Sequence, residues 1–488
     1  MPPRALIACL PLLALTTSGC DRRLDKRAVI VSAIGGPPGY GDVDRRPLDS
    51  AQRLLITATA QGLVQFDAAG QIEPGLAERW IVIDQGRSYI FRLREAEWAD
   101  GKPVTAGDVV KILRRAIDGR SKNPLKPFLS AIGEIKEMTP RVIEIDLARP
   151  RPDLLKLFAQ PELAILRPAP AIGSGPFRVL GLSTNTVALR PAFDPGRSPD
   201  EETGEPGADQ DIALIGERAA RAITRFRQRR ADLVLGGGFD EWPLLAAAGM
   251  ASANIRLDPA PGLFGLAVVN RAGLLEAVAG RAAIAGTIDR AALLAAFRPD
   301  WPAATRLLPD QLDSAAAPGI ASWSTLSGAD ALTAARQQVA AWRGAHPGPI
   351  ILRLALPAGP GGTLLFAHLA ARWRLLGIGV VRVAWTAPAD LRLIDAVAPY
   401  DSARWYLATA CQACSPQAMA ALDAAREAPT MADRARDIAE ADAVLTGDVA
   451  FIPIAQPLRW SLVAPRLDAW QGNPRAWHPL NRLRADTR

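Results

Sequence analysis

A tight turn followed by a capped helix is encoded in residues 98–110, Trp-Ala-Asp-Gly-Lys-Pro-Val-Thr-Ala-Gly-Asp-Val-Val. In the pair Asp100-Gly101, the glycine accepts a positive φ angle without the clash that a Cβ atom would cause. Thr105 is placed to cap a helix, and Asp108, three residues later, supplies the second half of a capping box. The segment therefore predicts a turn and then a helix that begins directly after Thr105.

The same helix is predicted to have one buried face. Apolar residues recur at helical spacing, and basic residues fill the opposite side. The apolar positions are Val109, Val110, Ile112, Leu113, Ala116 and Ile117, and the basic ones are Lys111, Arg114 and Arg115. The pattern predicts an amphipathic helix packed against a core.

Strand and helix patterns alternate along the rest of the chain, which is typical of an α/β protein. Residues 142–147 alternate apolar and charged side chains, as in a strand with one buried face. Residues 363–376 are predicted to form a helix that ends at Gly377, and residues 378–385 are then predicted to form a strand. Residues 433–445 are predicted to form another amphipathic helix. A chain of 488 residues with 49% hydrophobic content is too large for one core, so we expect two or three substructures.

The N-terminus predicts export. Arg4 precedes an apolar run, residues 5–15, which is too short to span about 30 Å of hydrocarbon but suits a signal peptide. Small residues then lead to Cys20, so residues 1–19 resemble a lipoprotein signal with Cys20 as the lipidated residue. Lipid attachment is stable when more than one acyl chain is bound, as on a lipoprotein cysteine. Asp21 resembles an inner-membrane retention signal and favours that membrane.

The net charge of +7 does not point to nucleic acid. The obvious basic segment is residues 225–230, but Ala220, Ile223 and Phe226 recur at helical spacing through it. The arginines are therefore interpreted as the solvated face of a helix. Together with the predicted export, this excludes nucleic acid from the expected partners.

Catalysis is not expected either. The chain has three histidines, His346, His368 and His478, and no Gly-x-Ser-x-Gly or GxxxxGK[ST] motif. The segment 173–175, Gly-Ser-Gly, lacks the strand and helix that a nucleophile elbow requires. We expect no enzyme activity, no cofactor and no metal site, and keep a hydrolase as a third hypothesis.

The sequence of residues 98–110 resembles the signature of the family 5 extracellular solute-binding proteins, the peptide-type receptors of ABC importers. Further segments resemble other conserved motifs of that family, and they occur in the same order along the chain. These are residues 62–67, 74–80, 89–94, 173–177 and 231–234. The resemblance covers most of the chain and is strongest over residues 50–180.

The resemblance implies an α/β fold, that of the two-lobed periplasmic binding proteins. It implies the type II-like kind, and within it the cluster of larger proteins that carry an extra subdomain. Two crossovers between the lobes would form a hinge. Lobe I would contain residues 20–50, 167–259 and 450–488, the extra subdomain 51–166, and lobe II 260–449.

The resemblance also implies a ligand site in the cleft between the lobes. Strand residues Ala33, Ile34 and Gly35 would bind a peptide backbone by strand addition. Gly237 and Phe239 would line the cleft from the hinge side, unless residues 236–242 are an ordinary flexible loop.

The second part of the implied site is residues 404–416, with Arg404, Trp405, Tyr406 and Gln412 as ligand contacts. Aligned on Pro416, Gln412 stands where the family has the aspartate that holds a peptide's α-ammonium group. An ammonium buried without a counter-charge costs several kcal/mol, so a free-amine peptide is disfavoured. The fork of Arg404 instead matches a ligand carboxylate; the alternative for Arg404 is a surface charge beside a core tryptophan.

Cys411 and Cys414 are the remaining thiols once the signal peptide and the lipidated cysteine are set aside. In an oxidising compartment they are expected to form a disulfide. Pro416 follows them in place of the helix that a thioredoxin-like site needs, which disfavours redox catalysis. A metal site would need two further ligands, which the neighbouring sequence does not offer.

The combined hypothesis is a monomeric, periplasmic, lipid-anchored receptor that passes a peptide-like or other small polar solute to ABC permease subunits. The alternative is a sensor or envelope-assembly module that uses the same scaffold without transport. The identity of the ligand is left open.

Overall fold

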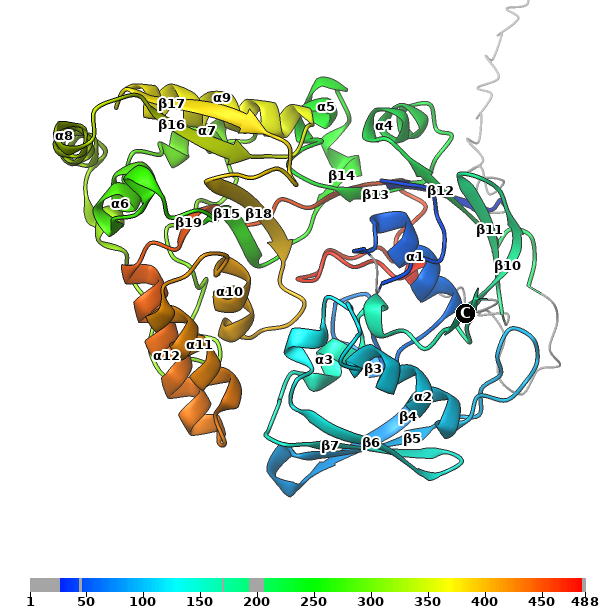
Figure 1. Ribbon diagram of the computed structural model, residues 1–488. Coiled ribbons are helices and arrows are strands. Elements are labelled where there is room, and N and C mark those ends of the chain that lie inside the picture. The colour runs from blue at the N-terminus through cyan, green and yellow to red at the C-terminus, as the bar shows by residue number, and fades with distance from the viewer. Residues whose placement is uncertain (1–26, 44–45, 169–170, 193–205, 485–488) are drawn as a thin grey trace, which may run out of the picture.

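The computed structural model describes residues 27–43, 46–168, 171–192 and 206–484. Two separate sheets form the cores of two lobes that lie side by side, and a smaller sheet lies below lobe I (Figure 1). The predicted signal peptide and Cys20 lie outside the described residues. Within the described part of the chain, no helix is long and apolar enough to cross a membrane.

Lobe I is built on a seven-stranded mixed sheet with β1 near its centre. Strand β1 runs parallel to β12 and β13, and the outer strands are antiparallel. In sheet order the strands are β10 (Phe177–Leu182), β11 (Thr186–Pro191), β12 (Ile212–Glu217), β1 (Val29–Ile34), β13 (Leu233–Gly237), β20 (Trp460–Val463) and β14 (Ile255–Leu257). Helices α1 (Ser50–Thr59) and α4 (Ala219–Arg227) cover opposite faces of this sheet (Figure 1).

Lobe II is built on a five-stranded sheet. In sheet order its strands are β17 (Ile378–Val383), β16 (Ile350–Ala355), β18 (Leu391–Val397), β15 (Gly262–Val268) and β19 (Phe451–Ala455). One core cluster of this lobe includes α6 (Val278–Gly286), α7 (Arg290–Ala295), α8 (Gly328–Ala345) and α9 (Pro360–Arg374). A second cluster includes α10 (Ala403–Ala410), α11 (Pro416–Glu427) and α12 (Met431–Gly447). Helix α5 (Trp242–Ala247) lies between α4 and α9.

The extra subdomain is built on a four-stranded antiparallel sheet. Its strands are β4 (Ala77–Ile83), β5 (Ser88–Leu93), β7 (Val142–Leu147) and β6 (Ile132–Thr139), packed with α2 (Ala106–Ile117) and α3 (Leu154–Phe158). The short hairpin of β2 (Val64–Phe66) with β3 (Ile72–Pro74) completes it, and a separate hairpin of β8 (Arg167–Pro168) with β9 (Ala171–Ile172) follows where the chain returns to lobe I.

The turn and helix predicted from residues 98–110 are confirmed. Gly101 has φ +79°, and the N–H of Gly101 donates to the Trp98 carbonyl at 2.9 Å. The Thr105 hydroxyl accepts from the Asp108 N–H at 3.2 Å, and the Asp108 carboxylate accepts from the Thr105 N–H at 3.3 Å. The capping box therefore starts α2 directly after Thr105.

Two predicted boundaries are wrong. Helix α1 begins at Ser50 and buries Leu54 and Leu55 against the lobe I sheet, so residues 51–59 belong to lobe I and not to the extra subdomain. Strand β19 pairs with β15 in the lobe II sheet, so the chain returns to lobe I after Ala455 and not at residue 450. Both boundaries were implied by the resemblance, and short-range sequence patterns do not specify which sheet will cover an element's apolar face.

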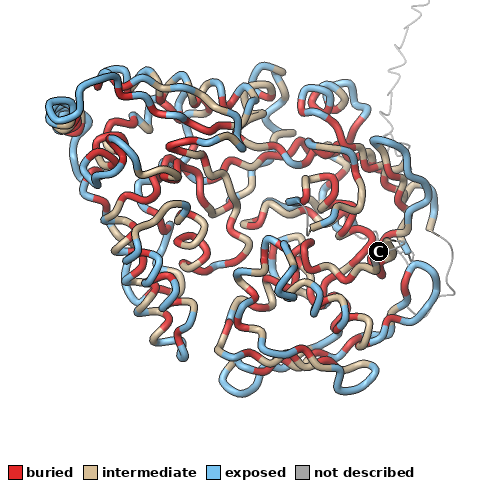
Figure 2. Tube along the Cα trace, in the orientation of Figure 1, coloured by how far each residue is buried: buried red, intermediate tan, exposed pale blue. Residues whose placement is uncertain are grey.

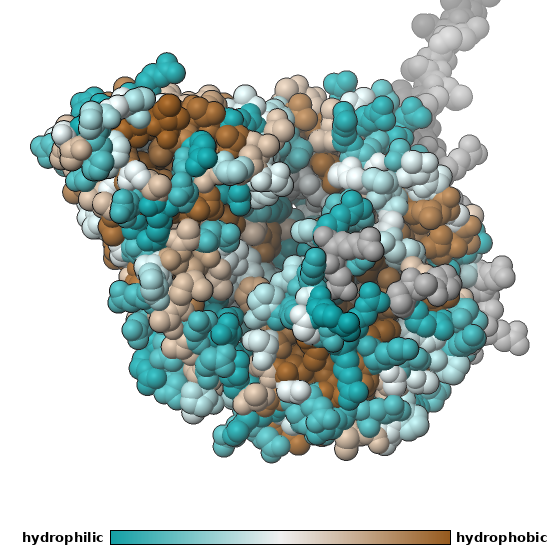
Figure 3. Space-filling model, in the orientation of Figure 1, coloured by the Kyte–Doolittle hydropathy of each residue, from teal (hydrophilic) through white to brown (hydrophobic). Residues whose placement is uncertain are grey.

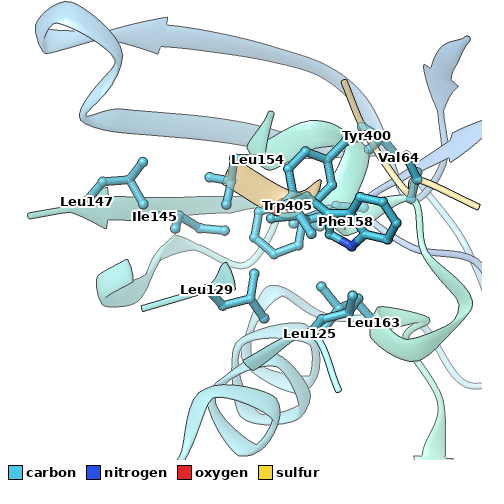
Figure 4. Close-up of a cluster of buried hydrophobic side chains, with 14 of the residues drawn as sticks. Val64, Leu125, Leu129, Ile145, Leu147, Leu154, Phe158, Leu163, Tyr400 and Trp405 are labelled. Atoms are coloured by element: carbon cyan, nitrogen blue, oxygen red, sulfur yellow. The ribbon is translucent and has the colours of Figure 1, made fainter. Parts of the chain in front are cut away.

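Lobe II and the extra subdomain share one apolar core. Buried residues, red in Figure 2, follow the strands inside each unit. Tyr400 and Trp405 of lobe II, 5% and 6% exposed, belong to the cluster that contains Leu129, Leu154 and Phe158 of the extra subdomain. Figure 4 shows these two aromatic rings among the extra subdomain's aliphatic side chains. The two units are therefore held together by apolar burial as well as by polar contacts.

Some apolar side chains stay exposed at the edge of lobe I. Val179, Leu180 and Leu182 of the edge strand β10 are 40%, 52% and 63% exposed, and they gather on the right of Figure 3. The pairing of β10 with β11 shifts between Val179 and Gly181, which is the kind of irregularity found at sheet edges.

Candidate functional site

Two crossovers connect the lobes. One joins β14 to β15 and the other joins β19 to β20. They lie beside each other, because the Asp258 N–H donates to the Arg459 carbonyl at 3.1 Å. A Cβ atom on Gly262 would lie 2.9 Å from the Pro457 ring and 2.1 Å from the Ala396 carbonyl oxygen. The arrangement matches the predicted hinge of paired segments.

Charged groups contact each other across this hinge. Arg459 donates to Asp395 of β18 at 2.8 and 3.1 Å. Burial raises the pKa of the Asp395 carboxyl, and the charge of Arg459 acts against this. Asp240 follows β13 in lobe I; its main-chain carbonyl accepts from the Gly361 N–H at 2.9 Å, and its carboxylate accepts from the Gly362 N–H at 2.7 Å. Asp240 therefore holds the N-terminus of α9 in lobe II against lobe I.

The carboxyl end of β1 opens onto a pocket. Gly35, Gly36, Glu217, Arg218 and Arg221 line it, with a volume of about 620 Å³. Ligands of open α/β sheets bind beyond the carboxyl ends of parallel strands, and this pocket lies at the ends of β1 and β12. Gly35, one of the predicted residues, lines this pocket.

Glu217 in this pocket is a paired charge. It accepts from the Ser32 hydroxyl at 2.7 Å and from Arg225 at 2.8 Å. Burial alone would raise the pKa of Glu217, but the hydrogen bonds from Arg225 and Ser32 lower it below its ordinary value. The carboxylate therefore stays ionised, beside the exposed side chains of Arg218 and Arg221.

Strand addition at Ala33 and Ile34 is not supported by the sheet. Ala33 pairs with Gly216 on one side and with Leu235 on the other, and Ile34 pairs with Glu217. A central strand has no free edge for a peptide. A ligand backbone can reach β1 only at its carboxyl end.

Gly237 and Phe239 lie close to β1 but do not line the pocket. A Cβ atom on Gly237 would lie 2.2 Å from the Trp460 ring, so glycine is required there for packing. Phe239 is 2% exposed and its ring lies 4.9 Å from that of Phe264 in lobe II. Its side chain is part of the apolar core, which corrects the prediction of a cleft-lining ring.

The structure does not bring the two predicted parts of the site together. Ala33, Ile34 and Gly35 lie at β1, apart from the second part, which is Arg404, Trp405, Tyr406 and Gln412. Residues 403–410 form α10, and Trp405 and Tyr406 are 6% and 1% exposed in the core shared with the extra subdomain. Gln412 is exposed and donates to the Thr409 carbonyl at 2.9 Å. Arg404 is half-buried, and its Cζ atom lies 5.9 Å from the Phe128 ring. The two aromatic residues are therefore core residues rather than cleft contacts.

Cys411 and Cys414 are bonded to each other between α10 and α11. The described residues contain no group of three or more His, Cys, Asp or Glu side chains placed to hold a metal ion.

Sequence reasoning missed the side chains that hold the loop between β18 and α10. The Gln160 amide donates to the Pro399 carbonyl at 3.1 Å, and Arg475 donates to the Ala398 carbonyl at 3.0 Å. Gln160 belongs to the extra subdomain and Arg475 to the C-terminal segment. Their contacts join residues more than 70 positions apart, so no local pattern could have signalled them.

Comparisons with known proteins agree with this architecture. The family model of bacterial extracellular solute-binding proteins, family 5 middle, matches residues 71–341. The probable deoxycholate-binding periplasmic protein YgiS of Escherichia coli K12 is 31% identical over 145 residues, which are 26% of this chain and 27% of YgiS. The periplasmic oligopeptide-binding protein OppA of Haemophilus influenzae is 39% identical over 112 residues, 22% of this chain and 20% of OppA. These alignments span well under half of each relative.

Solved structures match over nearly the full length. Haemophilus influenzae OppA in complex with the peptide RPPGFSPFR has a TM-score of 0.78 at 16% identity, covering 95% of this chain and 99% of that chain. The Escherichia coli murein tripeptide binding protein MppA has a TM-score of 0.78 at 19% identity, covering 94% and 98%. Because the family model covers more than half of the sequence and the fold has the two lobes of these receptors, this chain belongs to family 5 of the bacterial extracellular solute-binding proteins.

Proposed function

We propose that this chain is the solute receptor of an ABC importer, which captures a peptide-like or other small polar solute between its lobes and delivers it to the permease. The observation that carries the proposal is the pair of crossovers between two sheet-based lobes, with charged groups that meet across them. A hinge of this kind lets a few residues absorb the motion of whole lobes.

Capture depends on contacts that exist only when the lobes meet. The ion pair of Arg459 with Asp395 and the hydrogen bond of Asp240 to the N-terminus of α9 join the lobes beside the hinge. A solute shifts the equilibrium toward closure only by as much as it binds the closed form better than the open form. The solute is therefore expected to touch both lobes.

The solute class extends beyond free-amine peptides. OppA and MppA are named for an oligopeptide and a murein tripeptide, and YgiS for deoxycholate, a carboxylic acid without an amine. Gln412 carries no charge to hold an ammonium group. These observations favour a solute that is recognised through groups other than an α-ammonium.

We also propose that the chain acts as a monomer in the periplasm, attached to the inner membrane through acyl chains on Cys20. A diacylated cysteine buries enough methylene groups, at about 0.8 kcal/mol each, for stable attachment. Mass spectrometry of the mature N-terminus tests this. Cys20→Ala should move the protein from the membrane fraction to the periplasmic fraction, and an unmodified N-terminus at another residue would contradict the anchor.

A thermal-shift screen of the exported protein tests solute binding. The panel contains di- and oligopeptides, N-acetylated and amidated peptides, opines, bile acids, sugars and metal chelates. A true solute at 100 times its dissociation constant adds about 2.7 kcal/mol to the free energy of unfolding. The proposal is overturned if no member of the panel raises the melting temperature of the folded protein, and the preference against free amines fails if N-acetylation weakens binding.

A further inference from the structure

The pocket at the carboxyl ends of β1 and β12 is lined by residues of lobe I alone. The Gly35 N–H donates to the Glu217 carbonyl at 3.1 Å, and the Gly216 N–H donates to the Asn185 carbonyl at 2.9 Å. Main-chain hydrogen bonds therefore join three sides of the pocket, which are the end of β1, the end of β12 and the turn between β10 and β11. Its volume of about 620 Å³ is in the range of sites that bind small molecules.

Three arginines at α4 line this pocket. Arg218, Arg221 and Arg225 recur at helical spacing, so they lie on one side of the helix. Arg221 and Arg225 also line a second cavity of about 370 Å³ along α4, together with Arg230. These guanidinium groups therefore lie at two adjoining cavities and are not spread evenly over the exposed face of the helix.

The carboxylates near the pocket are already engaged by protein groups. Glu217 is the one acid among the described residues that line it. The Glu217 carboxylate accepts from Arg225 at 2.8 and 3.1 Å and from the Ser32 hydroxyl at 2.7 Å. The Asp49 carboxylate lies close to Gly36 but does not line the pocket, and it accepts from a main-chain N–H as the cap of α1.

Arg218 and Arg221 are left without a partner. Both are exposed, and within the described part of the chain neither side chain makes a hydrogen bond or an ion pair. Three guanidinium groups and one carboxylate line the pocket, which leaves two positive charges uncompensated. A concave surface lined by charges of one sign concentrates ions of the opposite sign, so this pocket attracts an anion.

We propose that Arg218 and Arg221 bind a phosphate group in this lobe I pocket, either as free phosphate or as the phosphate monoester of a small molecule. A guanidinium fork donates to two oxygens at once, and a phosphate has oxygens enough for two forks. A phosphate dianion also matches the two uncompensated charges, whereas a monocarboxylate supplies half of that charge. Because lobe I alone lines the pocket, binding there does not require lobe closure, and the site goes beyond the solute capture proposed above.

Titration calorimetry and thermal shift of the exported protein test the site. The probes are inorganic phosphate, glycerophosphate, glycerol and acetate at constant ionic strength. Phosphate should raise the melting temperature of the wild type and should bind roughly tenfold more tightly than acetate, and added salt should weaken binding because the pocket is open to solvent. The proposal is overturned if neither phosphate nor glycerophosphate stabilises the wild type, or if acetate binds as tightly as phosphate.

R221Q is the main variant, because Arg221 lines both cavities. It should bind phosphate roughly tenfold more weakly, as loss of charge-assisted hydrogen bonds implies, and R218Q should have a similar effect. R227Q is the matched control, since Arg227 is exposed on the same helix and lines neither cavity, and it should bind phosphate as the wild type does. Equal phosphate binding by R221Q, R218Q and R227Q would mean that these two arginines have no specific role, and the proposal would fail.

The comparison of glycerophosphate with inorganic phosphate identifies the source of the phosphate group. Tighter binding of the ester, lost in R221Q, assigns the pocket to a phosphorylated small molecule. Equal binding of the two, also lost in R221Q, assigns it to free phosphate. Glycerol that binds as tightly as glycerophosphate would contradict recognition of the phosphate group.

Gly262→Ala separates this site from the proposed receptor function. Gly262 lies at the hinge, where an added Cβ atom would meet the Ala396 carbonyl oxygen. The folded variant should bind phosphate as the wild type does, even where its binding of a carried solute is weakened. Phosphate affinity that falls together with solute affinity would contradict a site that is independent of closure. A failed solute screen, in turn, leaves a positive phosphate result standing.

Discussion

Arg475 donates from one Nη atom to both carboxylate oxygens of Asp401, at 2.6 Å each. Lys156 of the extra subdomain pairs with the same carboxylate at 2.5 Å. Asp401 lies in the loop between β18 and α10 of lobe II, so one side chain connects lobe II to both the C-terminal segment and the extra subdomain. Burial alone would raise the pKa of Asp401, but the hydrogen bonds from Arg475 and Lys156 lower it.

Asp401→Asn should loosen the contact of lobe II with the extra subdomain and the C-terminal segment. The carboxylate is 46% exposed, so loss of its charge should lower the free energy of unfolding by about 1–2 kcal/mol, between the values for exposed and buried pairs. Because the folded pKa is lowered, this contribution should also fade in wild type as the pH falls through that pKa. Denaturant unfolding and small-angle scattering without solute measure both effects. Asp310→Asn, an exposed loop aspartate, is the control, and an unchanged radius of gyration in Asp401→Asn would contradict the connecting role.

Thr105→Ala should destabilise the extra subdomain and leave solute binding unchanged. The substitution removes the hydroxyl that accepts from Asp108, and loss of such a cap costs about 1 kcal/mol. Thr333→Ala on the exposed face of α8 is the control and should change stability by less than about 0.5 kcal/mol. A changed solute affinity in Thr105→Ala would show that the signature turn takes part in binding.

Asp153→Asn should make the protein more stable above about pH 6. Burial, followed by the negative charge of Asp313, raises the pKa of Asp153 from 3.8 to about 6. The folded state therefore keeps a proton that the unfolded state has lost, and the contribution of Asp153 is lost as the pH rises through about 6. This rise in pKa corresponds to at most roughly 3 kcal/mol of unfolding free energy. Because Asp153 is partly exposed, the expected gain in stability of Asp153→Asn is about 1–2 kcal/mol.

The measurement for Asp153 is the difference in unfolding free energy between variant and wild type from pH 4 to pH 8. The difference should grow up to about pH 6 and then stay level. Glu440→Gln, at an exposed position of α12, should show no such rise. A difference that does not depend on pH would mean that Asp153 titrates normally.

Gly262→Ala should disturb the hinge. A Cβ atom there would lie 2.1 Å from the Ala396 carbonyl oxygen, and backbone cannot move aside as a flexible side chain can. We expect a loss of more than about 2 kcal/mol of stability together with weaker solute binding. Gly447→Ala is the matched control, because a Cβ atom there meets nothing within 4 Å and alanine favours a helix by about 0.5–1 kcal/mol.

Local patterns predicted several elements. The strand at 142–147, the helix over 433–445 and the glycine that ends α9 are all present, with Gly377 at φ +69°. Each of these rests on contacts between residues close in sequence, such as a cap or an alternating face. The assignment of α1 and β19 to sheets was wrong, because pairing partners are chosen by contacts between distant segments.

The candidate site was predicted less well for the same reason. The resemblance of residues 404–416 to the family's ligand-binding stretch placed Trp405 and Tyr406 in the cleft, whereas their rings are buried against the extra subdomain. Gly35 lines a pocket because it follows the carboxyl end of β1, and not through the strand addition that the resemblance implied.

The sequence by itself determined the class of fold, the family and the turn and capped helix at residues 98–110, because these depend on backbone preferences and short-range hydrogen bonds. Only the tertiary structure decided which charges are compensated. Asp401 meets Arg475 and Lys156, and Asp395 meets Arg459. Charge compensation depends on distances across lobes, and the chain brings those residues together only when it folds.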